Sequence, residues 1–155
     1  MKARFLAMAV FCDTTIEGKD GVLSIIRIVD RVNVVIPPDA EQPIRVPINI
    51  TLVLGFRAGG AKGTYTLKLE ADTPTGKTSA VGETPVSFQG PEEQGANIIS
   101  ALQLQIEGEG VYWFNVYLQD EFTTRVPLRV AYQHQGVESV KNPSGELAPA
   151  TESMK

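Results

Sequence analysis

Alternation of apolar and polar residues is the clearest pattern in this chain, and it is most regular between Ile44 and Phe56. Every second residue there is apolar, and of the residues in between only Val53 is apolar. Side chains of a β-strand point alternately to the two faces of a sheet, so this spacing places an apolar row against a core. The pattern predicts one long, half-buried strand, with a bend or bulge at Pro47, because proline cannot donate to a strand ladder.

Shorter runs predict strands on both sides of the long one. Residues 3–12 and 22–29 are apolar on both faces, with a turn at Asp20-Gly21 between them. We expect both faces of these two strands to be covered, by the core on one side and by a loop, the tail or a second subunit on the other. Residues 64–71 predict a strand that forms a hairpin with the long one, and a short strand follows around residues 86–88.

The C-terminal third repeats the two-residue rhythm in three runs. Residues 98–106 and 112–119 predict two strands joined by a turn at 107–110, and residues 125–130 predict the last strand. The even-numbered apolar residues of all three point inward, so the pairing should place even positions opposite even ones and Trp113 on the outside. Pro127 predicts an edge position or a bulge in the last strand.

The apolar rhythm stops at Gln133, and residues 133–155 are mostly polar. We expect this tail to be disordered or loosely docked, because it has few apolar groups to offset the entropy of ordering. Residues 1–132 then form one domain. Their short strands and Gly and Pro turns predict an all-β chain, an immunoglobulin-like antiparallel β-sandwich of seven to nine strands.

Composition narrows the function classes. A chain of 155 residues with 43% hydrophobic content has the size and apolar share of one domain. The formal net charge of −4 argues against nucleic acid and anionic membranes as partners. Cys12 is the one cysteine and His134 the one histidine, which leaves no internal disulfide and too few ligands for a zinc site. These features favour the reducing cytoplasm.

The N-terminus has the order of a secretory signal, since Lys2 and Arg4 precede an apolar run that ends at Cys12. That run is too short for a signal peptide and has no credible cleavage site, so we interpret it as the first strand and expect no export. No stretch of the sequence approaches the length of a membrane span.

Two loops are candidates for nucleotide binding. Residues 71–78, with Gly76 and Lys77, satisfy a relaxed phosphate-loop pattern. Such a loop needs a following helix whose N-terminus faces the phosphates, and Gly82 and Pro85 prevent one here. The glycine-rich run 55–64 fails the pattern because Lys62 is followed by glycine. We therefore interpret the first run as an exposed loop and the second as a hairpin loop.

Other reactive residues have structural interpretations. Asp13, Glu17 and Asp20 carry carboxylates for a calcium ion, but their spacing is not that of a calcium loop, and we expect solvated turn carboxylates. Cys12 ends an apolar strand with nothing nearby in sequence to lower its pKa, so we interpret it as a core residue. His134 stands alone at the start of the tail. We expect no enzyme activity, no cofactor and no metal.

The strongest surface candidate is the outward side of the last strands. Aromatic side chains there stand beside amides and arginine, a combination that favours protein interfaces and the stacking faces of sugar-binding proteins. The alternative is that the tail or a sister subunit simply covers Trp113. The candidate face comprises Gln103, Gln105, Trp113, Asn115, Tyr117 and Arg129.

The segment 110–116 (GVYWFNV), followed by 126–130 (VPLRV), resembles the last hairpin of many immunoglobulin-like sandwiches. With an opening strand that ends in Cys12-Asp13, residues 3–132 resemble a bacterial domain-of-unknown-function family of small stand-alone sandwich proteins. The resemblance implies a fold and no chemistry, because that family carries no established activity or site.

Together these observations predict a non-enzymatic protein-interaction or assembly module. It would work through a protein partner or by self-association, as a homo-oligomer or as part of a larger assembly. The alternative is a ligand-binding sandwich that recognises carbohydrate through Trp113 and Tyr117. Small-molecule ligands, nucleic acid and membranes are not the expected partners.

Overall fold

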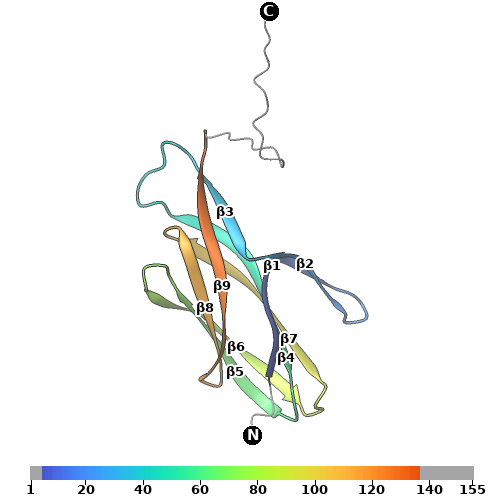
Figure 1. The fold of residues 1–155 in the computed structure, drawn as a ribbon. Helices are drawn as coiled ribbons and strands as arrows, with labels where there is room; N and C mark the ends of the chain where they lie inside the picture. Colours follow the sequence, from blue (N-terminus) through green and yellow to red (C-terminus); the bar gives the residue numbers. More distant parts are fainter. Residues whose placement is uncertain (1–4, 137–155) are drawn as a thin grey trace, which may run out of the picture.

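A computed structural model describes residues 5–136, and these residues form nine β-strands and no helix (Figure 1). The strands, in chain order, are β1 (Phe5–Glu17), β2 (Leu23–Val29), β3 (Arg31–Ile36), β4 (Val46–Arg57), β5 (Lys62–Asp72), β6 (Thr78–Gln89), β7 (Gly95–Ile106), β8 (Gly110–Leu118) and β9 (Glu121–His134). They make a four-stranded sheet, β2-β1-β4-β7, and a five-stranded sheet, β3-β9-β8-β5-β6. This confirms the predicted all-β sandwich.

The core lies between the two sheets, where the apolar rows of the strands meet. As the alternation predicts, the even-numbered residues of β4 and β8 point inward, and Leu52, Phe56 and Phe114 are almost completely buried. Phe11 of one sheet meets Phe114 of the other edge-on, with ring centroids 4.9 Å apart and an interplanar angle of 71°. Edge-to-face aromatic pairs add stabilisation beyond the area that they bury.

The strand pairing differs from the sequence-based prediction at two connections. The chain crosses from one sheet to the other between β4 and β5, and again between β7 and β8. The predicted hairpin of the long strand with residues 64–71 is therefore wrong: β4 pairs with β1 and β7, while β5 pairs with β6 and β8. Likewise β7 does not pair with β8. Alternation of apolar and polar residues indicates which face of a strand is buried, but it does not indicate with which other strand that strand pairs.

Sequence reasoning missed β3, which pairs in parallel with β9, so the sandwich is not purely antiparallel. Val32, Val34 and Ile36 did carry the two-residue signal, but Val35 between them hid it. Several strands also run beyond their predicted ends. β1 continues to Glu17, β6 begins at Thr78, and β9 extends to His134, past the predicted domain boundary at 132.

Pro47 and Pro127, the two prolines with a predicted effect on their strands, occupy places where a missing N–H leaves no ladder bond unmade. Pro47 lies where β4 pairs with β7 alone, and that pairing is regular, so the predicted bulge is absent there. Arg129 donates its backbone N–H to the Asp30 carbonyl at 3.0 Å, on the β3 side of β9. The nitrogen of Pro127 points to the same side two residues earlier, before β3 begins. The predicted edge position of Pro127 is confirmed.

A tyrosine corner closes the turn between β7 and β8. The Tyr112 hydroxyl donates to the Gly108 carbonyl at 2.9 Å, and it accepts the Glu107 backbone N–H at 3.3 Å. Burial raises the pKa of this hydroxyl above its ordinary value. A tyrosine at this corner is typical of immunoglobulin-like sandwiches.

The predicted tail lies almost wholly outside the described residues, as does the start of the predicted strand 3–12. Within the described range, no helix has the length and hydropathy that crossing a membrane requires.

Candidate interaction surfaces

The structure divides the predicted interaction face between the two sheets. Trp113, Asn115 and Tyr117 lie on the outer face of the five-stranded sheet, with Arg129 on the neighbouring strand β9. Gln103 and Gln105 belong to β7, in the other sheet, where they pair with residues of β4. The prediction that these glutamines lie beside Trp113 is therefore wrong, because the chain changes sheets at the turn that separates β7 from β8.

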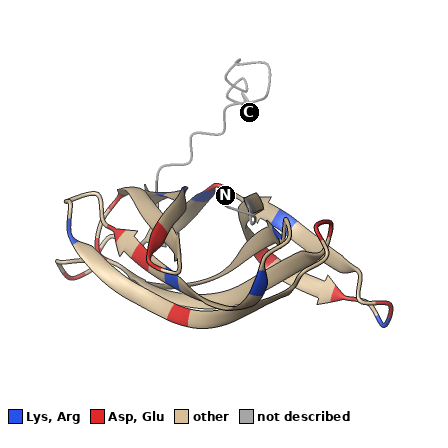
Figure 2. Cartoon of the chain, turned by 90° about the horizontal axis from the view of Figure 1, so that it is seen from below, with Lys and Arg blue, Asp and Glu red and all other residues tan. Residues whose placement is uncertain are grey.

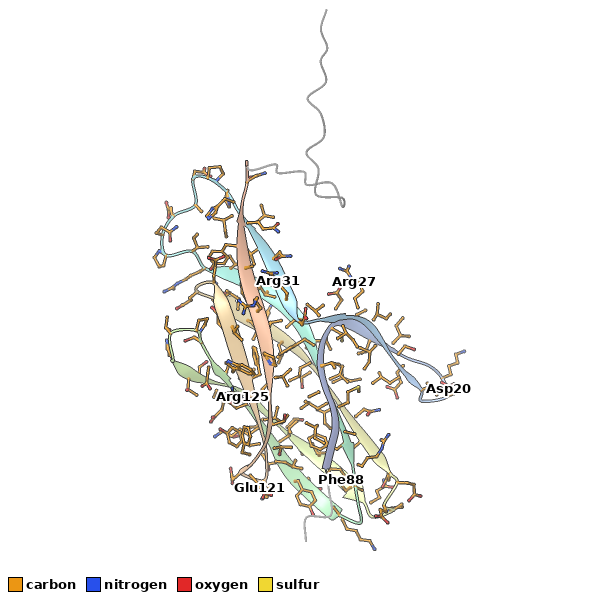
Figure 3. All side chains as sticks on the ribbon, in the orientation of Figure 1. Asp20, Arg27, Arg31, Phe88, Glu121 and Arg125 are labelled. Carbon is orange, nitrogen blue, oxygen red and sulfur yellow. The ribbon has the colours of Figure 1, made fainter. Side chains whose placement is uncertain are left out.

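Trp113 is half-buried, and what covers it is a residue that sequence reasoning did not consider. The Arg125 guanidinium lies 3.9 Å from the centroid of the Trp113 ring, over its face. Figure 3 labels Arg125, which belongs to the five-stranded sheet. Guanidinium groups bind aromatic faces through the ring quadrupole and by stacking. Arg125 lies on β9 opposite Asn115, two residues from the Pro127 that pairs with Trp113. The register of the two strands therefore makes Arg125 a diagonal neighbour of the tryptophan. A sugar stacking on that ring face would first have to displace the guanidinium.

The polar groups beside this stack satisfy one another. The Asp72 carboxylate accepts hydrogen bonds from the Thr78 hydroxyl at 2.5 Å and from the Asn115 amide at 2.8 Å. Asn115 is buried, so its donor would be costly to leave unpaired. The two hydrogen bonds, from Thr78 first and then Asn115, hold the pKa of Asp72 below its ordinary value because they favour the charged carboxylate.

A second group of contacts continues across the same face. Lys68 forms an ion pair with Glu70 at 2.8 Å, and its ammonium lies 5.9 Å from the centre of the Tyr117 ring. The Tyr117 ring in turn meets Phe122 edge-on, with centroids 5.8 Å apart. Many charged, amide and aromatic groups on the outer face of the five-stranded sheet thus bind one another. Fewer of them are available to bind a partner.

Replacing Asp72 with alanine should destabilise the protein more at neutral pH than in acid. The folded-state pKa of Asp72 is lowered, so its stabilising contribution is present above the unfolded-state value near 3.8 and is lost as the pH falls through the folded-state pKa. Urea unfolding of wild type and Asp72→Ala across this range measures the difference. Thr78→Val should show a smaller effect of the same sign, since Asn115 still donates. A loss of equal size at every pH would contradict this account.

The second surface is an arm formed by the hairpin of β1 and β2. β1 pairs with β4 only as far as Cys12, and from there to Glu17 it pairs with β2 alone. We call residues 13–29 the arm. It projects from the sandwich, with Asp20 at its tip (Figures 1 and 3). The predicted turn is confirmed: the Gly18 N–H donates to the Val22 carbonyl at 2.9 Å.

The arm is apolar on both of its faces. Ile16, Val22 and Ile28 expose 57%, 61% and 65% of their surface, values that are unusual for large aliphatic side chains. Leu23, Ile25 and Ile26 are half-buried, and the register with β1 places Ile25 and Ile26 on opposite faces. The charged residues of the arm lie at its tip or at its base (Figure 2). The shaft between them presents aliphatic surface to solvent.

Charge at the base of the arm is neutralised locally. Arg27 and Asp13 form an ion pair at 3.1 Å, while Asp20 accepts the Val22 backbone N–H at 3.1 Å. The three carboxylates considered as calcium ligands, Asp13, Glu17 and Asp20, therefore do not form one cluster. No cluster of three metal-ligating side chains occurs within residues 5–136.

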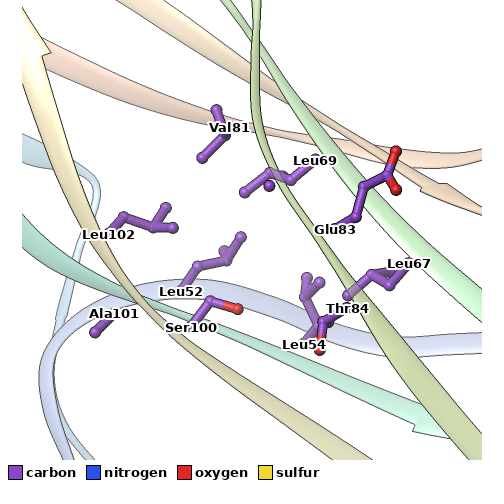
Figure 4. A pocket seen from close by; sticks show the side chains of 11 residues that line it. Leu52, Leu54, Leu67, Leu69, Val81, Glu83, Thr84, Ser100, Ala101 and Leu102 are labelled. Atoms are coloured by element: carbon purple, nitrogen blue, oxygen red, sulfur yellow. The ribbon is translucent and has the colours of Figure 1, made fainter.

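The third surface is the seam where the two sheets open at one side of the sandwich, between the edge strands β6 and β7. It holds a cavity of about 270 Å³ lined by core leucines, among them Leu52, Leu54, Leu67 and Leu69 (Figure 4). A second cavity of about 250 Å³ shares Val81 with the first and continues along the same strands. The inward side chains of β7, from Ala96 to Leu104, are half-buried, so this edge of the core is only partly covered.

Comparison with known proteins identifies the family. Residues 7–131 match DUF6941, a family of unknown function. The chain belongs to this family. A search of curated proteins found no match.

Among solved structures, this DUF6941 chain is similar to Pseudomonas fluorescens alkylpurine DNA glycosylase AlkC bound to DNA containing an abasic site analog. The sequence identity is 9% and the TM-score 0.46, over 83% of this chain and 30% of that one. The DUF6941 chain thus spans less than a third of the length of the glycosylase chain.

The remaining candidates for chemistry in this DUF6941 chain take structural places. Cys12 is fully buried, and burial first, then the nearby Asp13, raises the pKa of its thiol, the opposite of what a nucleophile needs. His134 lies exposed at the end of β9, opposite Ile36. Lys77 lies in the tight turn between β5 and β6, where the Thr73 N–H donates to its carbonyl at 2.9 Å. As predicted, no helix follows that turn; strand β6 begins there at Thr78, earlier than the short strand predicted around residues 86–88.

Sequence reasoning thus missed the arm and the seam as surfaces. A signal for the arm was present, because residues 22–29 are apolar on both faces. The seam had no comparable signal, since its leucines belong to three different strands, β4, β5 and β7.

Proposed function

We propose that this chain is a non-enzymatic protein-interaction module that binds its partner through the arm. One observation carries the proposal: a two-stranded hairpin with aliphatic side chains on both faces projects from the sandwich, and its Ile16, Val22 and Ile28 are more than half exposed. An immunoglobulin-like scaffold, supported by the Tyr112 corner, would present the arm, and we place its work in the cytoplasm on the strength of the single, unpaired cysteine.

The low stability expected of an unsupported hairpin favours this proposal. A two-stranded hairpin alone in water is marginally stable at best, because it lacks a third strand and a layer to pack against. Residues 13–17 of β1 have β2 as their one partner strand, and β2 has β1 as its one partner. An arm with exposed Ile16, Val22 and Ile28 gains both strand pairing and apolar burial when a partner binds.

The contrast between the outer faces of the two sheets also favours the arm. On the five-stranded sheet, charged and amide groups are paired with one another, and Trp113 is stacked under Arg125. On the four-stranded sheet, Val10, Val53 and Ile99 form an aliphatic row across β1, β4 and β7; Val53 is fully buried, while 42% of Ile99 is exposed. Exposed aliphatic side chains such as Ile99 and those of the arm are typical of interaction sites.

The proposal is tested by removing aliphatic surface from the arm without changing the core. Ile16→Ser with Ile28→Ser should abolish partner binding while leaving the unfolding free energy within about 1 kcal/mol of wild type, because both side chains are exposed. Val35→Ser is the matched control, since Val35 is exposed to 59% but lies on β3, away from the arm. The measurements are affinity capture from the native cell with mass spectrometry, and light scattering of the purified protein. A double variant that keeps every partner of the wild type refutes the proposal.

A further inference from the structure

We propose that the arm binds the seam of a second copy of this chain, so that β2 of one copy adds to the free edge of β7 in the next. This rests on the proposed function, in which the arm is the binding element, and it names the partner. The contact joins two different surfaces, head to tail, so each copy keeps one free arm and one free seam.

Strand direction favours this contact. β2 and β7 are the two edges of the same four-stranded sheet, and each neighbouring pair in that sheet is antiparallel. It follows that β2 runs opposite to β7. A second copy placed beside the first in the same orientation therefore presents β2 antiparallel to β7, and the sheet continues from copy to copy without inversion. The unpaired backbone groups of both edges would then be satisfied.

Both faces of β2 would find apolar neighbours in this arrangement. On the inward side, Leu23 and Ile25 would meet the seam, where Leu102 and Leu104 are half-buried above cavities of about 270 and 250 Å³. On the outward side, Ile26 and Ile28 would lie near Ile99. A strand that is apolar on both faces needs burial on both, and an edge strand with a cavity on one side and an aliphatic row on the other provides it.

Charge is compatible with the same pairing. Glu83 is the one charged residue among those lining the two seam cavities, and Arg27 is the one charged residue of β2. Their signs are opposite. Seam and strand are otherwise uncharged, so association should depend little on salt.

The test uses two variants that block one surface each. Ile25→Arg places a charge on the arm, and Leu102→Arg places one in the seam; Ser100→Arg, which lines the same cavity, replaces Leu102→Arg if the latter does not fold. Ser87→Arg is the matched control, an exposed β6 position on the outer side of the other sheet. Each protein is followed by sedimentation velocity from low micromolar to submillimolar concentration, with far-ultraviolet circular dichroism to confirm folding.

We expect wild type and Ser87→Arg to associate as the concentration rises, either into open chains longer than a dimer or into closed rings. Each blocked variant alone should be monomeric. A mixture of Ile25→Arg and Leu102→Arg should form a one-to-one dimer and nothing larger, because one intact seam meets one intact arm. This complementation also shows that both variants are folded.

Three results overturn the inference. A wild type that stays monomeric at the highest concentration excludes a second copy as the partner. A seam variant that still forms dimers, while the arm variant does not, assigns the contact to two arms. A mixture of folded blocked variants that remains monomeric excludes the head-to-tail contact. If a monomeric wild type captures another protein that the Ile16→Ser, Ile28→Ser variant loses, this inference falls and the proposed function stands.

Discussion

Replacing Phe114 with alanine should lower the free energy of unfolding by about 3–5 kcal/mol, the range typical of fully buried phenylalanines. Phe114 is 1% exposed and meets Phe11 of the opposite sheet at a centroid distance of 4.9 Å, so truncation removes an aromatic pair and leaves a cavity between the sheets. Domains are stable by only about 5–15 kcal/mol in total, which makes this a large fraction. Urea denaturation measures it, and thermal unfolding should shift by roughly 2–4 °C for each kcal/mol.

Phe122→Ala is the matched control for this substitution. Phe122 loses the same side-chain atoms, but 55% of it is exposed and it contacts Tyr117 on the surface. We expect a loss of at most about 1 kcal/mol, the worth of one aromatic contact. Equal losses for the two variants would mean that the contact between the sheets does not dominate the stability of this sandwich.

Gly110→Ala should be the second most damaging substitution, with an expected loss of about 2–4 kcal/mol. Gly110 opens β8 with a φ of 133°, a conformation that residues with a Cβ rarely adopt and that costs them about 1–3 kcal/mol. An added Cβ would also lie 2.7 Å from Cβ and Cγ of Pro74, in the turn between β5 and β6. Overpacking of this kind costs a comparable amount.

Gly76→Ala separates these two contributions. Gly76 also has a positive φ, 85°, but nothing lies within 4 Å of the Cβ that would be added. Backbone strain alone should cost about 1–2 kcal/mol there. Urea denaturation of both variants gives the difference, which we assign to the collision with Pro74. If Gly110→Ala is no more destabilising than Gly76→Ala, the Pro74 ring can move away from the added methyl group. The contact between Pro74 and the start of β8 then contributes no steric cost.

The interaction face illustrates where sequence reasoning stops. Trp113 and Tyr117 are on the outer face of their strand, as alternation requires, because successive side chains point to opposite faces whatever the strand pairs with. That Arg125 covers Trp113 depends on the register of β8 against β9, and on a bulge between Val116 and Tyr117 that no local pattern marks. Gln103 and Gln105 were assigned to this face because strands next to each other in sequence were expected to pair.

Three properties could be predicted from the amino-acid sequence: the chain is all β, one known side of most strands faces the core, and Pro127 takes an edge position. These properties are local, since they follow from the two-residue period of side chains and from the missing N–H of proline. The sequence also showed that residues 22–29 are apolar on both faces.

Other properties depend on the complete fold: which strands pair, that β3 joins β9 in parallel, and that the chain crosses between sheets before β5 and β8. The fold likewise sets the point, Cys12, at which the arm leaves the sandwich, and it brings leucines of three strands together at an open seam. Pairing and crossing depend on contacts between residues far apart in the chain, and several arrangements satisfy the same alternation. The choice among them is made by packing of the whole core, which no single segment encodes.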